Sequence, residues 1–241
     1  VSLKLLNHLG IKKSLVSYFE HNKEFKGNMI VERILAGETC ALVSDAGSPA
    51  ISDPGEDLVK QCAAAGITVC AIPGPCAAIT ALSISGQSTG RFCFEGFLST
   101  AKKSRREHLE SLAKEQRTMI FYEAPHKLIY TLKDMFEYFG DRRISLCREL
   151  TKIHEEVFRT TLSEAIEYYT QNKPKGEFVL VVEGAKAEEL VSVETIEQAY
   201  EQVKNLVSKG MRGADACKEI AKSTDFSKGE LYAMLLEDKG N

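Results

Sequence analysis

The chain has 241 residues, of which 44% are hydrophobic and 27% charged, a composition typical of a globular protein with one large or two small domains. Its formal charge of −3 argues against a generally basic nucleic-acid binder, although a local basic patch is compatible with it. The seven cysteines form no C-x-x-C pair and no apolar run is long enough to span a membrane, which favours a cytoplasmic protein with reduced thiols, no metal and no membrane partner.

The first hundred residues predict alternating helices and strands. After an apolar helical pattern that begins at Val1, we expect a helix at 30–38, a strand at 40–45, a helix at 56–67, a strand at 68–74, a helix at 75–86 and a strand at 91–97. Strands and helices that alternate in units of about 25 to 30 residues are typical of parallel βαβ crossovers. We therefore expect a sheet in this half that the strand at 91–97 closes.

A second set of elements follows. We expect a helix at 102–115, a strand at 117–124, a helix at 125–140, strands at 142–150 and 155–162, a helix from Ser163, a strand at 176–184, and short helices near 195–208, 212–222 and 227–237. Two successive strands without a helix between them predict a mixed sheet. The sequence thus predicts the α/β class, with α/β domains at 1–97 and 98–190 and a helical tail at 191–241.

Two loops rich in glycine, proline and small residues each follow a predicted strand. They are "SDAGSP" (44–49) and "PGPCAA" (73–78). Ligands of parallel α/β sheets bind beyond the carboxyl ends of the strands, and small residues leave room for a flat ligand against the main chain. Two ordinary connecting loops are the alternative interpretation. Because two such loops follow neighbouring strands, a nucleotide-like ligand is favoured, although neither a G-x-G-x-x-G fingerprint nor a P-loop is present.

Several ordered segments resemble a known family. These are "LVSDAGSPAISDPG", "PGPCAAITALSISG", "FCFEGFL", "MIFYEAPHKL", "CRELTKIHEE" and "GEFVLVVEG". They are similar to the tetrapyrrole-methylase superfamily, and within it to the ribosomal small subunit methyltransferase I family, over nearly the whole chain. The resemblance implies two α/β domains with S-adenosyl-L-methionine in the cleft between them, and a homodimer. It also implies methylation of the ribose 2′-OH of a cytidine in the decoding region of 16S rRNA, within the small ribosomal subunit.

Two features at the ends of the chain bear on this resemblance. The family has a further strand and a Pro/Gly loop before the position of Val1, so we expect that an N-terminal segment is missing here. The helices expected within 211–237 are similar to the helix-turn-helix-like C-terminal segment of the family.

The resemblance also implies which residues bind the cofactor. Asp45 is expected near the ammonium group of its methionine end, and the turn at 73–78 near its adenosine. The full set is Asp45, Ala46, Gly47, Ser48, Pro49, Gly74, Pro75, Cys76, Ala77, Ala78, Phe121, Gly176 and Glu177. A cationic sulfonium ligand with an adenine ring suits a carboxylate, backbone polar groups and small packing residues.

Catalytic and RNA-binding candidates come from the second half of the chain. Ribose methylation needs a 2′-OH that is oriented and whose proton is accepted. The candidates are Glu123, His126, Glu149 and Lys152, and those for RNA phosphates are Lys102, Lys103, Arg105, Arg106 and Arg148. A packing or capping role for His126, a structural salt bridge of Arg148, and a solvated helix face for the basic cluster are the alternatives. A methyltransferase for a small molecule such as a corrin precursor, or a non-catalytic RNA-binding assembly factor, are the rival functions.

Overall fold

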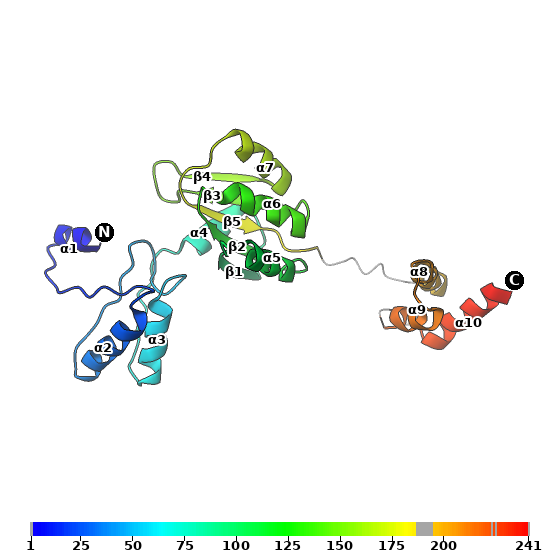
Figure 1. Ribbon diagram of the computed structural model, residues 1–241, viewed down its shortest axis with the longest axis horizontal. Coiled ribbons are helices and arrows are strands. Elements are labelled where there is room, and N and C mark those ends of the chain that lie inside the picture. Colours follow the sequence, from blue (N-terminus) through cyan, green and yellow to red (C-terminus); the bar gives the residue numbers. More distant parts are fainter. Residues whose placement is uncertain (1, 187–194, 223, 225, 241) are drawn as a thin grey trace. The chain divides into compact units, whose positions relative to one another are not determined.

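The computed structural model describes residues 2–186, 195–222, 224 and 226–240 (Figure 1). The chain divides into two compact units, Val1–Ala185 and Lys186–Asn241. The domain boundary predicted between residues 97 and 98 stays a prediction, and the one between 190 and 191 lies outside the described residues. Within the described ranges, no helix has the length and apolar character needed to cross a membrane.

The predicted helices and the predicted strands from residue 91 onward are present. The larger unit contains α1 (Ser2–His8), α2 (Lys23–Leu35), α3 (Gly55–Ala64), α4 (Ala77–Ser85), β1 (Phe92–Phe97), α5 (Lys102–Ser111), β2 (Thr118–Glu123), α6 (Leu128–Phe139), β3 (Arg143–Arg148), β4 (Glu156–Thr161), α7 (Leu162–Gln171) and β5 (Phe178–Val182). The smaller unit contains α8 (Ile196–Ser208), α9 (Gly213–Ile220) and α10 (Lys228–Gly240).

The sheet is mixed, as the sequence predicts. Its order is β1-β2-β5-β3-β4, in which β1 and β2 are parallel and the remaining neighbours antiparallel. The expectation that the strand at 91–97 closes a sheet of the first half is wrong, because β1 forms its ladder with β2, with Phe92 opposite Thr118. The α/β class is confirmed.

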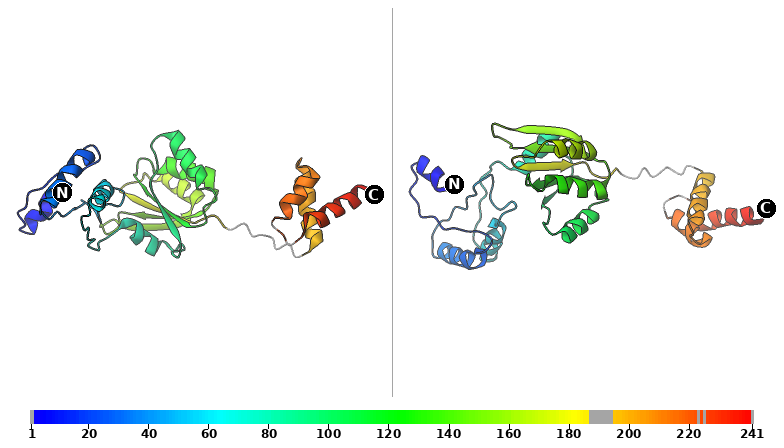
Figure 2. Two further views of the ribbon diagram at one scale, coloured as in Figure 1. Left: turned by 90° about the horizontal axis from the view of Figure 1, so that it is seen from below. Right: turned by 45° about the horizontal axis from the view of Figure 1, so that its top comes forward.

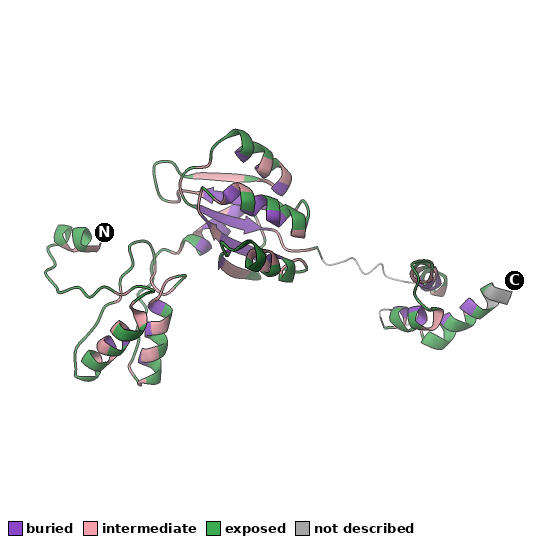
Figure 3. Cartoon of the chain, viewed as in Figure 1, coloured by how far each residue is buried: buried purple, intermediate pink, exposed green. Residues whose placement is uncertain are grey.

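Side-chain alternation gives the sheet two buried faces. Met119 and Phe121 of β2 belong to the large core under α5, α6 and α7, whereas Ile120 and Tyr122 belong to the cluster that packs under α4. The central strands β2, β5 and β3 are accordingly the most continuously buried part of the unit, whereas the outer strand β4 is mostly half-buried (Figure 3). Figure 2 shows the strands from two further sides. Helices therefore cover both faces of the sheet, and the loops at the ends of the strands remain accessible.

Two predicted strands of the first half are wrong. Residues 40–45 and 68–74 join no ladder among the described residues, and Val43, Val69 and Ile72 are exposed to 56%, 51% and 86%. Their apolar, β-branched composition is a local signal, but a parallel strand also requires a hydrogen-bonded neighbour that is distant in sequence. The parallel βαβ crossovers predicted there are therefore absent from the described part of the chain, although helices α2, α3 and α4 are present.

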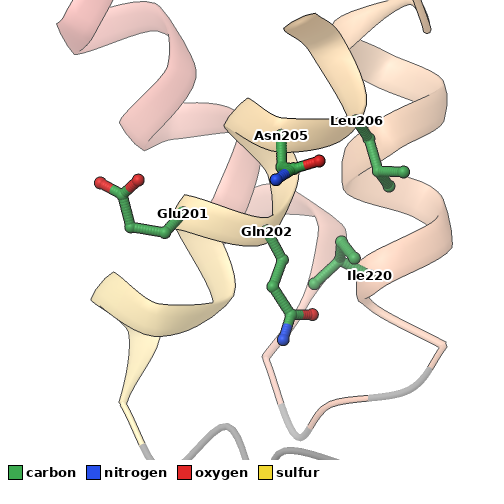
Figure 4. A pocket seen from close by; sticks show the side chains of 5 residues that line it. All are labelled: Glu201, Gln202, Asn205, Leu206 and Ile220. Atoms are coloured by element: carbon green, nitrogen blue, oxygen red, sulfur yellow. The ribbon is translucent and has the colours of Figure 1, made fainter. Parts of the chain in front are cut away.

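The smaller unit is a three-helix cluster around a separate apolar core. Ala199, Val203, Ala216, Cys217 and Leu231 are fully buried in it. An open depression on α8 and α9 is lined by Glu201, Gln202, Asn205, Leu206 and Ile220 (Figure 4). This lining includes none of the residues that the sequence predicts for the site, all of which lie in the larger unit.

Candidate functional site

The two glycine- and proline-rich loops meet in the structure. The backbone N–H of Ser48 donates to the carbonyl oxygen of Pro75 at 2.9 Å, and the Ser48 hydroxyl approaches the same oxygen at 3.3 Å. Gly47 has φ +73°, and a Cβ there would lie 2.9 Å from that oxygen. A Cβ on Gly74 would lie 3.1 Å from Ser48 Oγ. Glycine is therefore needed at Gly47 for both its conformation and the close approach of the second loop.

The first loop continues into a tightly bonded turn. One carboxylate oxygen of Asp53 accepts hydrogen bonds from the N–H groups of Ala50 at 2.8 Å and Gly55 at 2.9 Å. Ala50 and Ser52 have φ values of 64° and 58°, a left-handed region that non-glycine residues adopt at a cost of about 1–2 kcal/mol each. Non-glycine strain of this kind clusters at ligand sites, where the surrounding structure enforces it. Asp45, nearer the start of the loop, is exposed, and its carboxylate accepts a hydrogen bond from the Ser2 hydroxyl at 2.8 Å.

The second loop leads into α4, which is fastened to the sheet at both ends. At its start, the N–H of Ala78 donates to the phenol oxygen of Tyr122 at 3.1 Å. At its end, the carbonyl of Ser85 accepts from the Ser145 hydroxyl at 2.7 Å and from Arg159 Nε at 3.1 Å. The turn before α4 is thus held over the end of the sheet, next to the first loop.

Tyr122, rather than Phe121, is the β2 side chain that faces this loop pair. The sequence predicts that Phe121 contacts the cofactor, but the Phe121 side chain cannot do so, because it is fully buried in the core on the opposite face of the sheet. Successive strand residues point to opposite faces, so a ligand on the α4 face meets Tyr122. The alternation of "MIFYE" carries this signal, but the sequence alone does not reveal which face α4 covers.

Several of the residues predicted from the second half of the chain lie at one end of the strands. Glu123 lies at the end of β2 and pairs with Phe178 at the start of β5, and Phe178 also pairs with Arg148 at the end of β3. Glu149 and Glu177, the neighbours of these residues, therefore lie side by side although 28 positions apart.

At this end of the strands, hydrogen bonds and ion pairs join Glu149, Lys152 and Glu177 in one cluster. One Glu149 carboxylate oxygen accepts from the Glu177 N–H at 2.9 Å and from Lys152 Nζ at 3.0 Å, and Lys152 Nζ lies 3.4 Å from a Glu177 carboxylate oxygen. Glu149 has φ 51°, and a Cβ on Gly176, whose φ is +79°, would lie 2.5 Å from Glu149 Cγ. The Glu177 N–H and Lys152 lower the pKa of Glu149, and Glu149 raises the pKa of Lys152. At neutral pH, the cluster therefore contains a carboxylate and an ammonium group.

Glu123 and His126 differ in what they contact. Glu123 is 4% exposed, and its two carboxylate oxygens accept from the Ala124 N–H at 2.8 Å and the Thr131 hydroxyl at 2.5 Å. These bonds hold the start of α6 against the end of β2. His126 is exposed in a turn rather than in the first turn of the helix, because Lys127 N–H bonds Ala124 O and α6 begins two residues later.

Three of the predicted RNA-binding arginines have intramolecular partners. Arg148 Nε lies 2.9 Å from a carboxylate oxygen of Glu156, so the salt bridge proposed as the alternative is present. Arg105 Nε binds Asp134 at 2.7 Å, with both side chains less than one-fifth exposed, and Arg106 binds Glu137 at 2.7 Å. These pairs fasten α5 to α6. In contrast, Lys102 and Lys103 are exposed, and Lys103 Nζ lies 3.8 Å from a Glu107 carboxylate oxygen.

Comparisons with known proteins show the family of the chain. A family model described as Tetrapyrrole (Corrin/Porphyrin) Methylases matches residues 4–166. The chain is 45% identical over 235 residues to "Ribosomal RNA small subunit methyltransferase I" of Synechocystis sp., which covers 97% of this chain and 84% of that relative. It is 46% identical over 232 residues to the protein of the same name from Bacillus subtilis, which covers 95% of this chain and 80% of the relative.

Solved structures show the same fold at low sequence identity. Diphthine synthase matches with a TM-score of 0.54 and 12% identity, over 75% of this chain and 73% of its own. The methyltransferase CobJ matches with a TM-score of 0.51 and 22% identity, over 66% of this chain and 70% of its own. The family model and the two relatives establish that the chain belongs to the tetrapyrrole methylase family and, within it, to the ribosomal RNA small subunit methyltransferase I family.

Proposed function

We propose that the protein methylates RNA of the small ribosomal subunit with S-adenosyl-L-methionine as methyl donor, and that its target is the ribose 2′-OH of a cytidine in the decoding region of 16S rRNA. Family membership supports methyl transfer to this RNA. The observation that carries the proposal is the contact between Ser48 and Pro75, which joins the two loops that the cofactor would need.

The loop pair suits this cofactor. Gly47 and Gly74 let the two loops approach each other closely, because a Cβ at either position would meet the opposite loop. The small residues beside them, Ala46, Ala77 and Ala78, would leave room for a flat ligand against the main chain. Residues 45–49 would hold the methionine end, with the Asp45 carboxylate near its ammonium group, and residues 74–78 would hold the adenosine. When bound, the cofactor supplies a methyl group on a positively charged sulfur. Tyr122, which contacts the start of α4, completes the adenosine side.

In this proposal, the methyl-accepting RNA binds at the ends of β2 and β3. Lys152 stays protonated beside Glu149 and Glu177, so it donates hydrogen bonds and suits a hydroxyl or a phosphate rather than proton removal. The two bonds to Glu123 and its burial give that residue a structural role. The proton acceptor is therefore to be sought in Glu149 and His126, which follow the ends of β3 and β2 in the chain.

Methylation of purified small subunits tests the proposal. Subunits from cells without the protein would be incubated with the full chain and S-adenosyl-L-methionine, and the nucleosides of the 16S rRNA analysed by mass spectrometry. We expect one new 2′-O-methylcytidine. A methyl group on a base, or transfer to a tetrapyrrole in place of RNA, would overturn the assignment. Glu149→Gln and His126→Gln would then identify the proton acceptor by the larger loss of single-turnover rate.

A further inference from the structure

We propose that Tyr122 is a positioning residue for the methyl donor, because its phenol oxygen caps the first turn of α4 and thereby holds the two cofactor loops together. This inference rests on the proposed function, since it concerns the same loops. It assigns a residue to the site through its contact with the helix, not through a contact with the reacting atoms.

The first turn of α4 depends on this cap. The first N–H groups of any helix have no partner within the helix and need one outside it. The Cys76 side chain, at the N-cap position, does not cap the helix, whereas the Tyr122 oxygen lies 3.1 Å from the N–H of Ala78. The cap of α4 therefore comes from strand β2, 44 residues away in sequence.

The Tyr122 ring is held in place by its neighbours. Its centroid lies 5.0 Å from that of Phe94 and 5.4 Å from that of Phe97, both in edge-to-face geometry. Burial, and to a smaller extent Cys76, raises the pKa of Tyr122, so the phenol is neutral at physiological pH. A neutral phenol accepts the bond from Ala78 and keeps its own proton to donate.

A short series of contacts connects this cap to the first loop. Pro75 lies three residues before Ala78, and its carbonyl oxygen receives both the N–H and the hydroxyl of Ser48. The position of the Pro75 carbonyl, and with it the space beside Gly47, thus depends on how firmly the start of α4 is held. The end of α4 is fastened independently by Ser145 and Arg159, so removal of the phenol oxygen would loosen the first turn without releasing the helix.

Tyr122→Phe in the full chain tests the proposal, because it removes the oxygen and keeps the ring. We expect affinity for S-adenosylhomocysteine, measured by calorimetry, to fall roughly 3- to 10-fold, the effect of losing one neutral hydrogen bond. The KM for S-adenosyl-L-methionine should rise by a similar factor, while kcat at saturating cofactor and the KM for the small subunit stay unchanged. A purely structural role would lower thermal stability without this split.

Tyr169→Phe is the matched control. Tyr169 is buried on the opposite face of the sheet beside Phe178, with ring centroids 5.6 Å apart, whereas Tyr122 is half-buried. It should leave cofactor affinity unchanged. Equal affinity of wild type and Tyr122→Phe would overturn the positioning role and leave the proposed function standing. Wild-type protein that fails to bind both S-adenosylhomocysteine and S-adenosyl-L-methionine would overturn the proposed function and this inference with it.

Discussion

Replacement of Gly47 by alanine should separate the two loops. The change places an L-residue at φ +73°, which costs about 1–2 kcal/mol. It also sets a Cβ 2.9 Å from the Pro75 carbonyl oxygen, a backbone atom that moves only with its loop. Relief of this contact weakens the Ser48–Pro75 hydrogen bond, worth about 0.5–1.5 kcal/mol. If the ligand binds only when the two loops are in contact, about 1–2 kcal/mol of these costs reduces its binding free energy. Its affinity then falls roughly 5- to 30-fold.

Gly66→Ala separates the loop contact from backbone strain. Gly66 has φ +69°, nearly the value at Gly47, but a Cβ there meets nothing within 4 Å. Both variants should be destabilised by backbone strain in urea unfolding, and Gly47→Ala by about 0.5–1.5 kcal/mol more, because its loop contact is weakened. Calorimetric titration with S-adenosylhomocysteine should show weaker binding only for Gly47→Ala. If both variants bind as tightly as wild type, the close approach of the loops does not matter for the ligand, and the cofactor site must lie elsewhere.

Three further predictions concern charged groups. Lys102→Ala with Lys103→Ala should lower the salt dependence of RNA binding by about 0.7–0.9 in slope for each phosphate that the variant no longer neutralises. Arg105→Ala should instead reduce stability by about 1–3 kcal/mol in urea unfolding, because the buried Asp134 carboxylate loses its partner at 2.7 Å and keeps the more distant Arg106, at 3.7 Å; the reverse pattern would refute the distinction. Lys152→Ala should reduce single-turnover methylation by roughly 10²-fold with unchanged cofactor affinity, because the hydroxyl or phosphate that it holds would be misplaced, and a reduction under threefold would leave Lys152 only a structural role. Hydrogen bonds from Arg117 lower the pKa of Glu115 from 4.5 to about 2. Wild type should therefore be more stable than Glu115→Gln above pH 4.5, and the difference in the free energy of unfolding should disappear as the pH falls toward 2. A difference in urea unfolding that stays constant with pH would contradict this.

Elements whose signal is local are predictable from the sequence. The helix at 75–86 is recognised by Pro75 near its start and by Gly86, which ends it in the left-handed conformation. In α6, Leu128, Leu132 and Met135 are fully buried as their helical spacing predicts. The apolar pattern also predicts Phe136 in this stripe, but it is 41% exposed, because it follows Met135 by one position and lies about 100° further around the helix.

Elements that depend on a distant partner are less predictable. The segments 40–45 and 68–74 have strand-like composition but no ladder in the described part of the chain, and the strand at 91–97 pairs with β2 instead of the first half. Composition indicates that a segment is apolar and extended, but its neighbour in a sheet is decided by long-range packing. The same reason explains Phe121: period-two alternation separates it from Tyr122, but only the position of α4 determines which of the two faces the loops.

The predicted site shows both cases side by side. The loop at 44–49 and the turn at 73–78 carry their own glycine and proline signals, so both could be predicted as loops, although the strands expected before them are absent from the described part of the chain. The cluster of Glu149, Lys152 and Glu177 could not, because it exists only through the antiparallel register that sets Arg148 opposite Phe178. Gly176 is the one local trace of that register. Gly176 has φ +79°, and a Cβ there would lie 2.5 Å from Glu149 Cγ. Larger residues are therefore excluded where the segment after β3 approaches the segment before β5. A glycine just before a buried strand thus indicates an approaching loop, and the partner becomes identifiable only when the strand order is known.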